Sequence, residues 1–222
     1  MMKPPTAEYR SHPPGGCSGR LGAARRWPEL AALVLLAACS SNPPIPDWQL
    51  NAKAASERAV AAYLTGNARS DAAEPARARA EVARTGRAEL LARVELAHCA
   101  AQVASLVFEP CDAFEPLRAD ATDAERAYVD RLAGRSTTAE PTALQGIDDP
   151  LSRLVAAGVL FETNRADPQV IQTAIDTASA QGWRRPLLAW LNVQLKRAEA
   201  AGASAESEQL RRRIALVQGS AR

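Results

Sequence analysis

Residues 150–219 read PLSRLVAAGVLFETNRADPQVIQTAIDTASAQGWRRPLLAWLNVQLKRAEAAGASAESEQLRRRIALVQG. Prolines at positions 150, 168 and 186 are each 18 residues apart, and Ser204 follows after the same interval. Proline suits the first position of a helix, and serine suits the capping position before it. The spacing predicts four helices of similar length, joined by short turns, that pair into two hairpins of about 36 residues.

Apolar residues recur at helical spacing within each of these four segments, so each segment should bury one face. The expected inward residues are Leu151, Leu154, Val155, Ile171, Ala174, Ile175, Ala178, Leu187, Trp190, Leu191, Leu210, Ile214 and Val217. In their spacing, the hairpins resemble those of the tetratricopeptide class, whose fuller consensus the chain does not meet. An ordinary bundle of evenly sized helices is the alternative.

The preceding part, residues 47–134, also carries helix signals, whereas β-branched residues never alternate with polar ones over a useful length. The first expected helix starts after Asp47, as its cap residue, and runs to about Thr65. The second runs from Pro75 to Gly86, the third stops at Pro110, and the fourth runs from a Thr122–Glu125 capping box to Gly134. The third should bury Leu90, Val94, Ala97, Ala101 and Phe108, and the fourth Ala127, Tyr128 and Leu132. Residues 135–149, rich in Ser, Thr, Pro and Gly, should form a loop before the hairpins of residues 150–219. The sequence therefore predicts an all-α domain of antiparallel helical hairpins.

Charge divides the chain near residue 38. Hydrophobic residues make up 47% of the sequence and aromatics 5%, because alanine supplies much of the apolar content. Beyond residue 38 there remain 22 basic and 23 acidic residues, a nearly neutral balance. A neutral domain has no net field to attract phosphates, so no nucleic-acid partner is expected.

Residues 1–38 have the layout of a secretory signal peptide with a long N-terminal region: Arg25 and Arg26, then an apolar run, then small residues. The apolar run from Leu30 to Ala38 is nine residues long, and a membrane-spanning helix needs about 20. It is therefore expected to be cleaved rather than to anchor the protein.

The four residues Leu36-Ala37-Ala38-Cys39 resemble the lipobox of bacterial lipoproteins. The resemblance implies cleavage before Cys39, a covalent diacylglycerol and an N-acyl chain on that residue, and no other cofactor. Residues 39–46 would form a flexible tether, because they are polar and rich in proline. Ser40, which is not aspartate, implies attachment to the outer membrane, facing the periplasm.

Few side chains in the mature domain suit catalysis. His98 is its only histidine and is expected to pack at the flank of an apolar stripe, and no His, Cys and carboxylate set has metal-ligand spacing, so neither catalytic nor metal-binding residues are assigned. Paired carboxylates could cleave a glycosidic bond, and the pairs to consider are Asp148 with Asp149 and Asp112 with Glu115. Both pairs have a structural explanation instead: Asp149 precedes Pro150 as a helix cap, and Asp112 lies in a turn between Pro110 and Pro116.

Two further features are a pair of cysteines that could form a disulfide and a Trp-Arg-Arg group that could bind a partner protein. Cys99 and Cys111 form an even pair in an oxidising compartment, which favours a disulfide; two separate thiols are the alternative. Trp183, Arg184 and Arg185 combine aromatic and cationic groups near a helix start and are candidate partner-binding residues. The alternative is a core tryptophan, Trp190, with solvated arginines at a turn.

The sequence thus leads to the expectation of a non-catalytic envelope lipoprotein whose helical hairpins bind another envelope protein. The alternatives are an enzyme acting on a cell-wall glycan and a carrier that holds a ligand between its helices.

Overall fold

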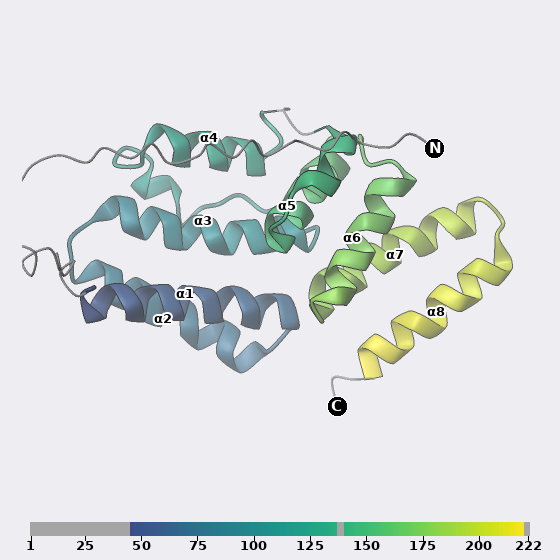
Figure 1. The fold of residues 1–222 in the computed structure, drawn as a ribbon, viewed down its shortest axis with the longest axis horizontal. Helices are drawn as coiled ribbons and strands as arrows, with labels where there is room; N and C mark the ends of the chain where they lie inside the picture. Colours follow the sequence, from purple (N-terminus) through teal and green to yellow (C-terminus); the bar gives the residue numbers. More distant parts are fainter. Residues whose placement is uncertain (1–44, 137–139, 220–222) are drawn as a thin grey trace, which may run out of the picture. The chain divides into compact units, whose positions relative to one another are not determined.

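The computed structural model describes residues 45–136 and 140–219, which contain eight α-helices, two 3₁₀ helices and no strand (Figure 1). The prediction of an all-α fold is confirmed. The described residues from Ile45 onward cluster as one compact unit. The signal peptide, Cys39 and nearly all of the tether lie outside the described residues. The elements are α1 (Asp47–Thr65), α2 (Ala68–Ala83), α3 (Ala88–Ala104), η1 (Glu115–Leu117), α4 (Asp123–Leu132), η2 (Pro141–Gly146), α5 (Pro150–Glu162), α6 (Pro168–Ala180), α7 (Arg184–Ala200) and α8 (Ser204–Gly219).

The helices pack mostly against their neighbours in the chain. α1 and α2 form an antiparallel hairpin, and each helix from α5 to α8 packs against the next (Figure 1). α3 joins the two parts, because it contacts α1, α2, α4 and α5. One continuous apolar core therefore runs from Tyr63 in α1 to Ile214 in α8.

Local capping chemistry sets several helix starts. Asp149 and Asp167 accept hydrogen bonds from the backbone N–H groups of Ser152 and Val170, which places Pro150 and Pro168 at the first helical position as predicted. The Thr122–Glu125 capping box is also present, with both of its reciprocal hydrogen bonds. These starts depend on residues close in sequence, which is why pattern alone located them.

Two predicted cap residues and two predicted helix starts at prolines are wrong. Asp47 and Ser204 are the first residues of α1 and α8 and do not cap them. α2 begins at Ala68, because the side chain of Asn67 accepts a hydrogen bond from the N–H of Ser70, and Pro75 lies in the middle of the helix. α7 begins at Arg184, so Pro186 is its third residue. Proline is tolerated there because the first N–H groups of a helix have no partner within the helix.

The predicted end and buried face of α3 are also wrong. The helix ends at Ala104, where Leu106 adopts a φ of 60° and the N–H of Val107 bonds to the carbonyl of Gln102, well before Pro110. Of the five residues predicted to be inward, only Ala101 is buried. The buried face holds Ala92, Glu95, Leu96, Cys99, Ala100, Ala101, Val103 and Ala104. The buried face is wide because α1, α2, α4 and α5 all pack against α3.

The predicted inward residues of the last four helices agree better with the structure. All of them are buried except Leu151 and Val217, which are half-buried, and Trp190 is completely buried. In α4, by contrast, Ala127 is exposed and Val129 takes the core position. Residues 140–147, in the segment predicted to be a loop, include η2, whose Leu144 is buried.

Candidate functional site

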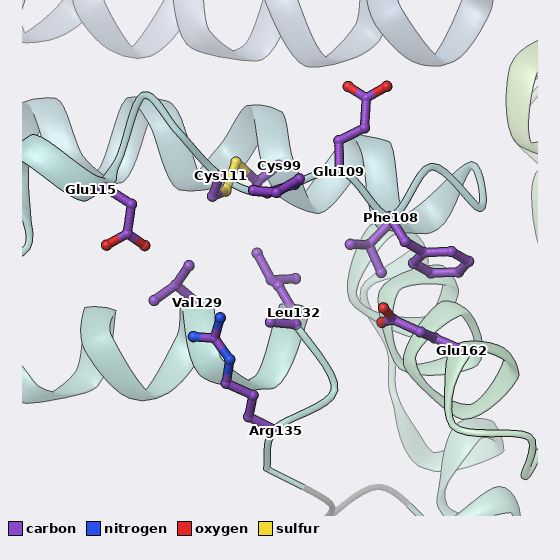
Figure 2. Close-up of a pocket in the computed structure, with 12 residues that line it drawn as sticks. Cys99, Phe108, Glu109, Cys111, Glu115, Val129, Leu132, Arg135 and Glu162 are labelled. Carbon is purple, nitrogen blue, oxygen red and sulfur yellow. A yellow bond between two sulfur atoms is a disulfide. The ribbon is translucent and has the colours of Figure 1, made fainter.

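A disulfide between Cys99 and Cys111 borders a small cavity between α3 and α4 (Figure 2). The two Cα atoms are 6.0 Å apart, within the range that a disulfide spans. The bond holds the chain that leaves α3 against the helix it has just left. The cavity has a volume of about 170 Å³, and residues from the end of α4 and the end of α5 complete its lining.

Charged side chains surround this cavity. Glu115 accepts two hydrogen bonds from Arg118, each 2.8 Å, and this pairing lowers the pKa of Glu115. Glu162 lies on another side of the cavity, and partial burial raises its pKa. Arg135 extends from the end of α4 into the space between Glu115 and Leu132 (Figure 2). Two carboxyl groups with oppositely shifted pKa values thus line one cavity.

Aromatic rings connect the cavity to the core. Phe108 stacks on Phe161 with ring centroids 6.4 Å apart, and Phe161 meets Trp190 edge to face at 5.7 Å. The indole N–H of Trp190 donates a hydrogen bond to the carbonyl of Ala104, with a length of 3.2 Å. The disulfide loop, α5 and α7 are therefore packed as one group.

The candidate partner-binding residues contact the rest of the protein. Trp183 is half-buried and precedes the first residue of α7. The guanidinium of Arg184 donates to the carbonyls of Thr65 and Gly66, at the turn between α1 and α2. The first of these contacts is exposed and the second is partly buried, so Arg184 joins distant parts of the chain while its side chain remains partly accessible.

Arg185 occupies a cluster that sequence reasoning missed. Its guanidinium pairs with Asp71 of α2 at 3.1 Å and lies over the ring of Tyr63 of α1, 3.9 Å from the centroid. Tyr63 in turn meets His98 of α3 edge to face, with centroids 5.3 Å apart. The cluster therefore brings together side chains from four helices.

Burial controls the chemistry of the cluster. Desolvation raises the pKa of the Tyr63 hydroxyl above its ordinary value, although Arg185 opposes this change. Desolvation also lowers the pKa of His98. The Nδ1 atom of His98 is buried and has no hydrogen-bond partner among the described residues. A neutral histidine is favoured at this position.

Other glutamates of the helical hairpins are buried against arginine. Glu95 of α3, whose side chain is 4% exposed, accepts two hydrogen bonds from Arg79 of α2, of 2.5 and 2.7 Å. Glu74 of α2 accepts one hydrogen bond from Arg58 of α1 and one from Arg77 of its own helix. The signal that could have revealed Glu95 is its place among small apolar residues on the buried side of α3.

The carboxylate pairs considered from the sequence are not brought together as catalytic pairs. Asp149 caps α5, Asp148 is exposed beside it, and Asp112 is exposed and absent from the cavity lining that includes Glu115. Within residues 45–136 and 140–219, no three His, Cys, Asp or Glu residues gather as metal ligands. No helix in the same ranges is long and apolar enough to cross a bilayer.

Comparison with known proteins gave no match to a family model, to a curated protein or to a solved structure.

Proposed function

We propose that the chain is a lipoprotein of the bacterial envelope, held in the outer membrane through a lipid on Cys39 and facing the periplasm. The observation that carries this proposal is the lipobox Leu36-Ala37-Ala38-Cys39 at the end of an apolar run. The start of the compact helical unit near residue 45 supports it, because only a short tether then separates the proposed lipid from the domain.

The lipid anchor is tested by a substitution at the acceptor thiol. Cys39→Ser should abolish the incorporation of a labelled fatty acid and leave the signal peptide uncleaved, because only a thiol accepts the diacylglycerol. Cys17→Ser is the matched control, since it removes another cysteine upstream of the expected cleavage point. Labelling and maturation that persist in Cys39→Ser would contradict the assignment.

We further propose that the helical domain of this lipid-anchored protein is a scaffold that binds another envelope protein. Consecutive pairing of α5, α6, α7 and α8 supports it, because stacked hairpins offer an extended surface while their apolar faces are used internally. Trp183 is the proposed contact residue. It is partly accessible, and Arg184 beside it adds a cationic group at the surface.

The partner is tested by photo-crosslinking in intact cells. A photoreactive phenylalanine analogue at position 183 should give one discrete crosslinked product, identified by mass spectrometry. The same analogue at position 209, an exposed residue of α8, is the control for random collisions. Equal crosslinking patterns at both positions would remove the support for a contact site at Trp183.

A second candidate is an enzyme acting on a cell-wall glycan, and the cavity in Figure 2 is the observation that favours it. Glu162, with a raised pKa, suits a general acid, and Glu115, with a lowered pKa, suits the ionised partner. The volume of about 170 Å³ is below the roughly 300 Å³ at which ligand pockets begin, so substrate would have to bind across the mouth. Glu162→Gln should abolish any turnover of purified peptidoglycan, whereas Glu208→Gln in α8 should not.

A further inference from the structure

Exposed apolar side chains gather where the helical unit begins. Of the three large hydrophobic residues that are exposed in the described ranges, Ile45 and Leu50 belong to this start, with 57% and 50% exposure. Ile45 precedes the cap residue of α1 and Leu50 is the fourth residue of the helix, the positions of a hydrophobic staple. Even in staple positions, both residues remain about half exposed to water.

A groove adjoins this start. Trp48 and Ala52 of α1, Val82 of α2, and Leu90 and Val94 of α3 give it an apolar lining, and its volume is about 500 Å³. The lining residues come from the first half of α1, the end of α2 and the first half of α3, which lie at one end of the α1–α3 group (Figure 1). Trp48 is only half-buried there. Ile45 and Leu50 do not line the groove, but Trp48, which does, lies between them in the sequence. We call the groove lining together with Ile45 and Leu50 the α1 entry surface.

The cations around the α1 entry surface are paired with carboxylates. Lys53 pairs with Glu57 at 3.8 Å. Arg87 pairs with Glu89, and Arg93 with Glu125, each at 2.6 Å. Local charge is therefore close to balanced, so the surface suits an apolar or zwitterionic partner better than a strongly anionic one.

The tether limits where this surface can be. Seven residue steps separate Cys39 from Pro46, the residue that caps α1. A fully extended chain covers at most ~3.6 Å per residue, so the start of α1 would lie within about 25 Å of a lipidated Cys39. A bilayer is the one apolar phase that the anchor itself would hold within this reach.

We propose that the α1 entry surface docks on the bilayer that holds the lipid anchor, with Trp48 at the level of the headgroups. This inference rests on the proposed lipidation of Cys39. Tryptophan beside exposed aliphatic residues is the usual composition of a surface that lies in the membrane interface. Docking would fix the orientation of the helical unit on the membrane.

Tryptophan quenching tests the docking on the full, lipidated protein. The protein is reconstituted in zwitterionic phosphatidylcholine vesicles with or without bromine on the acyl chains, and lipidation is verified by mass. Brominated lipid should quench part of the fluorescence, and Trp48→Phe should remove most of that quenching. Trp183→Phe is the matched control and should leave it unchanged. Raising salt from 0.1 to 0.5 M should also change it little, because the surface is balanced in charge.

Leu50→Gln provides a second variant whose fold is not at risk, because half of Leu50 is exposed. It should also reduce the quenching. If the lipidated protein shows the same quenching with and without Trp48, the docking proposal is wrong, whereas the proposed lipid anchor on Cys39 is unaffected. A chain without lipid would overturn both. Burial of Trp48 against a second copy, detected as a crosslinked dimer without quenching, would also overturn it.

Discussion

Gly158 of α5 lies directly against the backbone carbonyl of Val103 in α3, so that a Cβ atom at position 158 would overlap the carbonyl oxygen. The two helices cross at a point where only glycine fits. Gly158→Ala should therefore force α3 and α5 apart and destabilise the fold by about 1–3 kcal/mol. Chemical denaturation measures the loss. Gly146→Ala is the control, because no atom lies within 4 Å of a Cβ built there.

The contact between Gly158 and Val103 could not be predicted from the sequence. The starts of α5 and α6 could be, because aspartate is favoured at the cap position and proline at the first helical position, and these preferences depend only on neighbouring residues. Gly158 is different, since its role depends on a helix that lies more than 50 residues earlier. The sequence pattern placed the start of the second helix at Pro75, whereas the helix begins at Ala68 after the Asn67 cap. That cap is local, but it was overlooked in the sequence.

The candidate sites were predictable to different degrees. Counting cysteines pointed to Cys99 and Cys111, because a short separation and an even number already restrict the choice. The pairing of Arg185 with Asp71 spans 114 residues, and no local pattern indicates it. Glu115 of η1 and Glu162 of α5 also come from separate elements, so the cavity that both line appears only when these elements have packed.

The disulfide should contribute strongly to stability. Cys99→Ser removes a bond that closes a loop across 12 residues, and the loss should be on the order of 3 kcal/mol, seen as a lower thermal midpoint. Cys111→Ser and the double variant should melt at the same temperature as Cys99→Ser, because each lacks the same bond. Two free thiols in the denatured, unreduced wild type would show that the bond does not form in cells.

Acid should weaken the fold through His98. Burial lowers the pKa of His98 in the folded state below its ordinary 6.5, so the unfolded chain binds a proton more readily. The stabilisation is complete above pH 6.5 and is lost as the pH falls toward the lower pKa of the folded state. Denaturation of the wild type should therefore show a loss of stability from pH 7 to pH 5 that is smaller in His98→Gln. Equal slopes for the two proteins would refute this assignment.

Arg185 should couple α7 to the α1–α2 hairpin. Arg185→Ala removes both the ion pair with Asp71 and the contact with the Tyr63 ring. A double-mutant cycle with Asp71→Asn should give a coupling of about 1 kcal/mol, because the two residues are in direct contact. A parallel cycle of Arg185→Ala with Asp176→Asn in α6 serves as the reference. Additive effects in the first cycle would show that the ion pair contributes nothing.

Trp190 and Trp183 should differ sharply when truncated. Trp190 is fully buried, contacts Phe161 and donates a hydrogen bond to Ala104, so Trp190→Ala should cost about 3–5 kcal/mol through lost burial and a residual cavity. Trp183 is half-buried at a helix start, so Trp183→Ala should cost much less. It should nevertheless weaken crosslinking to the envelope partner. Thermal melts of both variants give the comparison. If Trp183→Ala unfolds the protein as readily as Trp190→Ala, Trp183 is a core residue and the proposed contact site loses its basis.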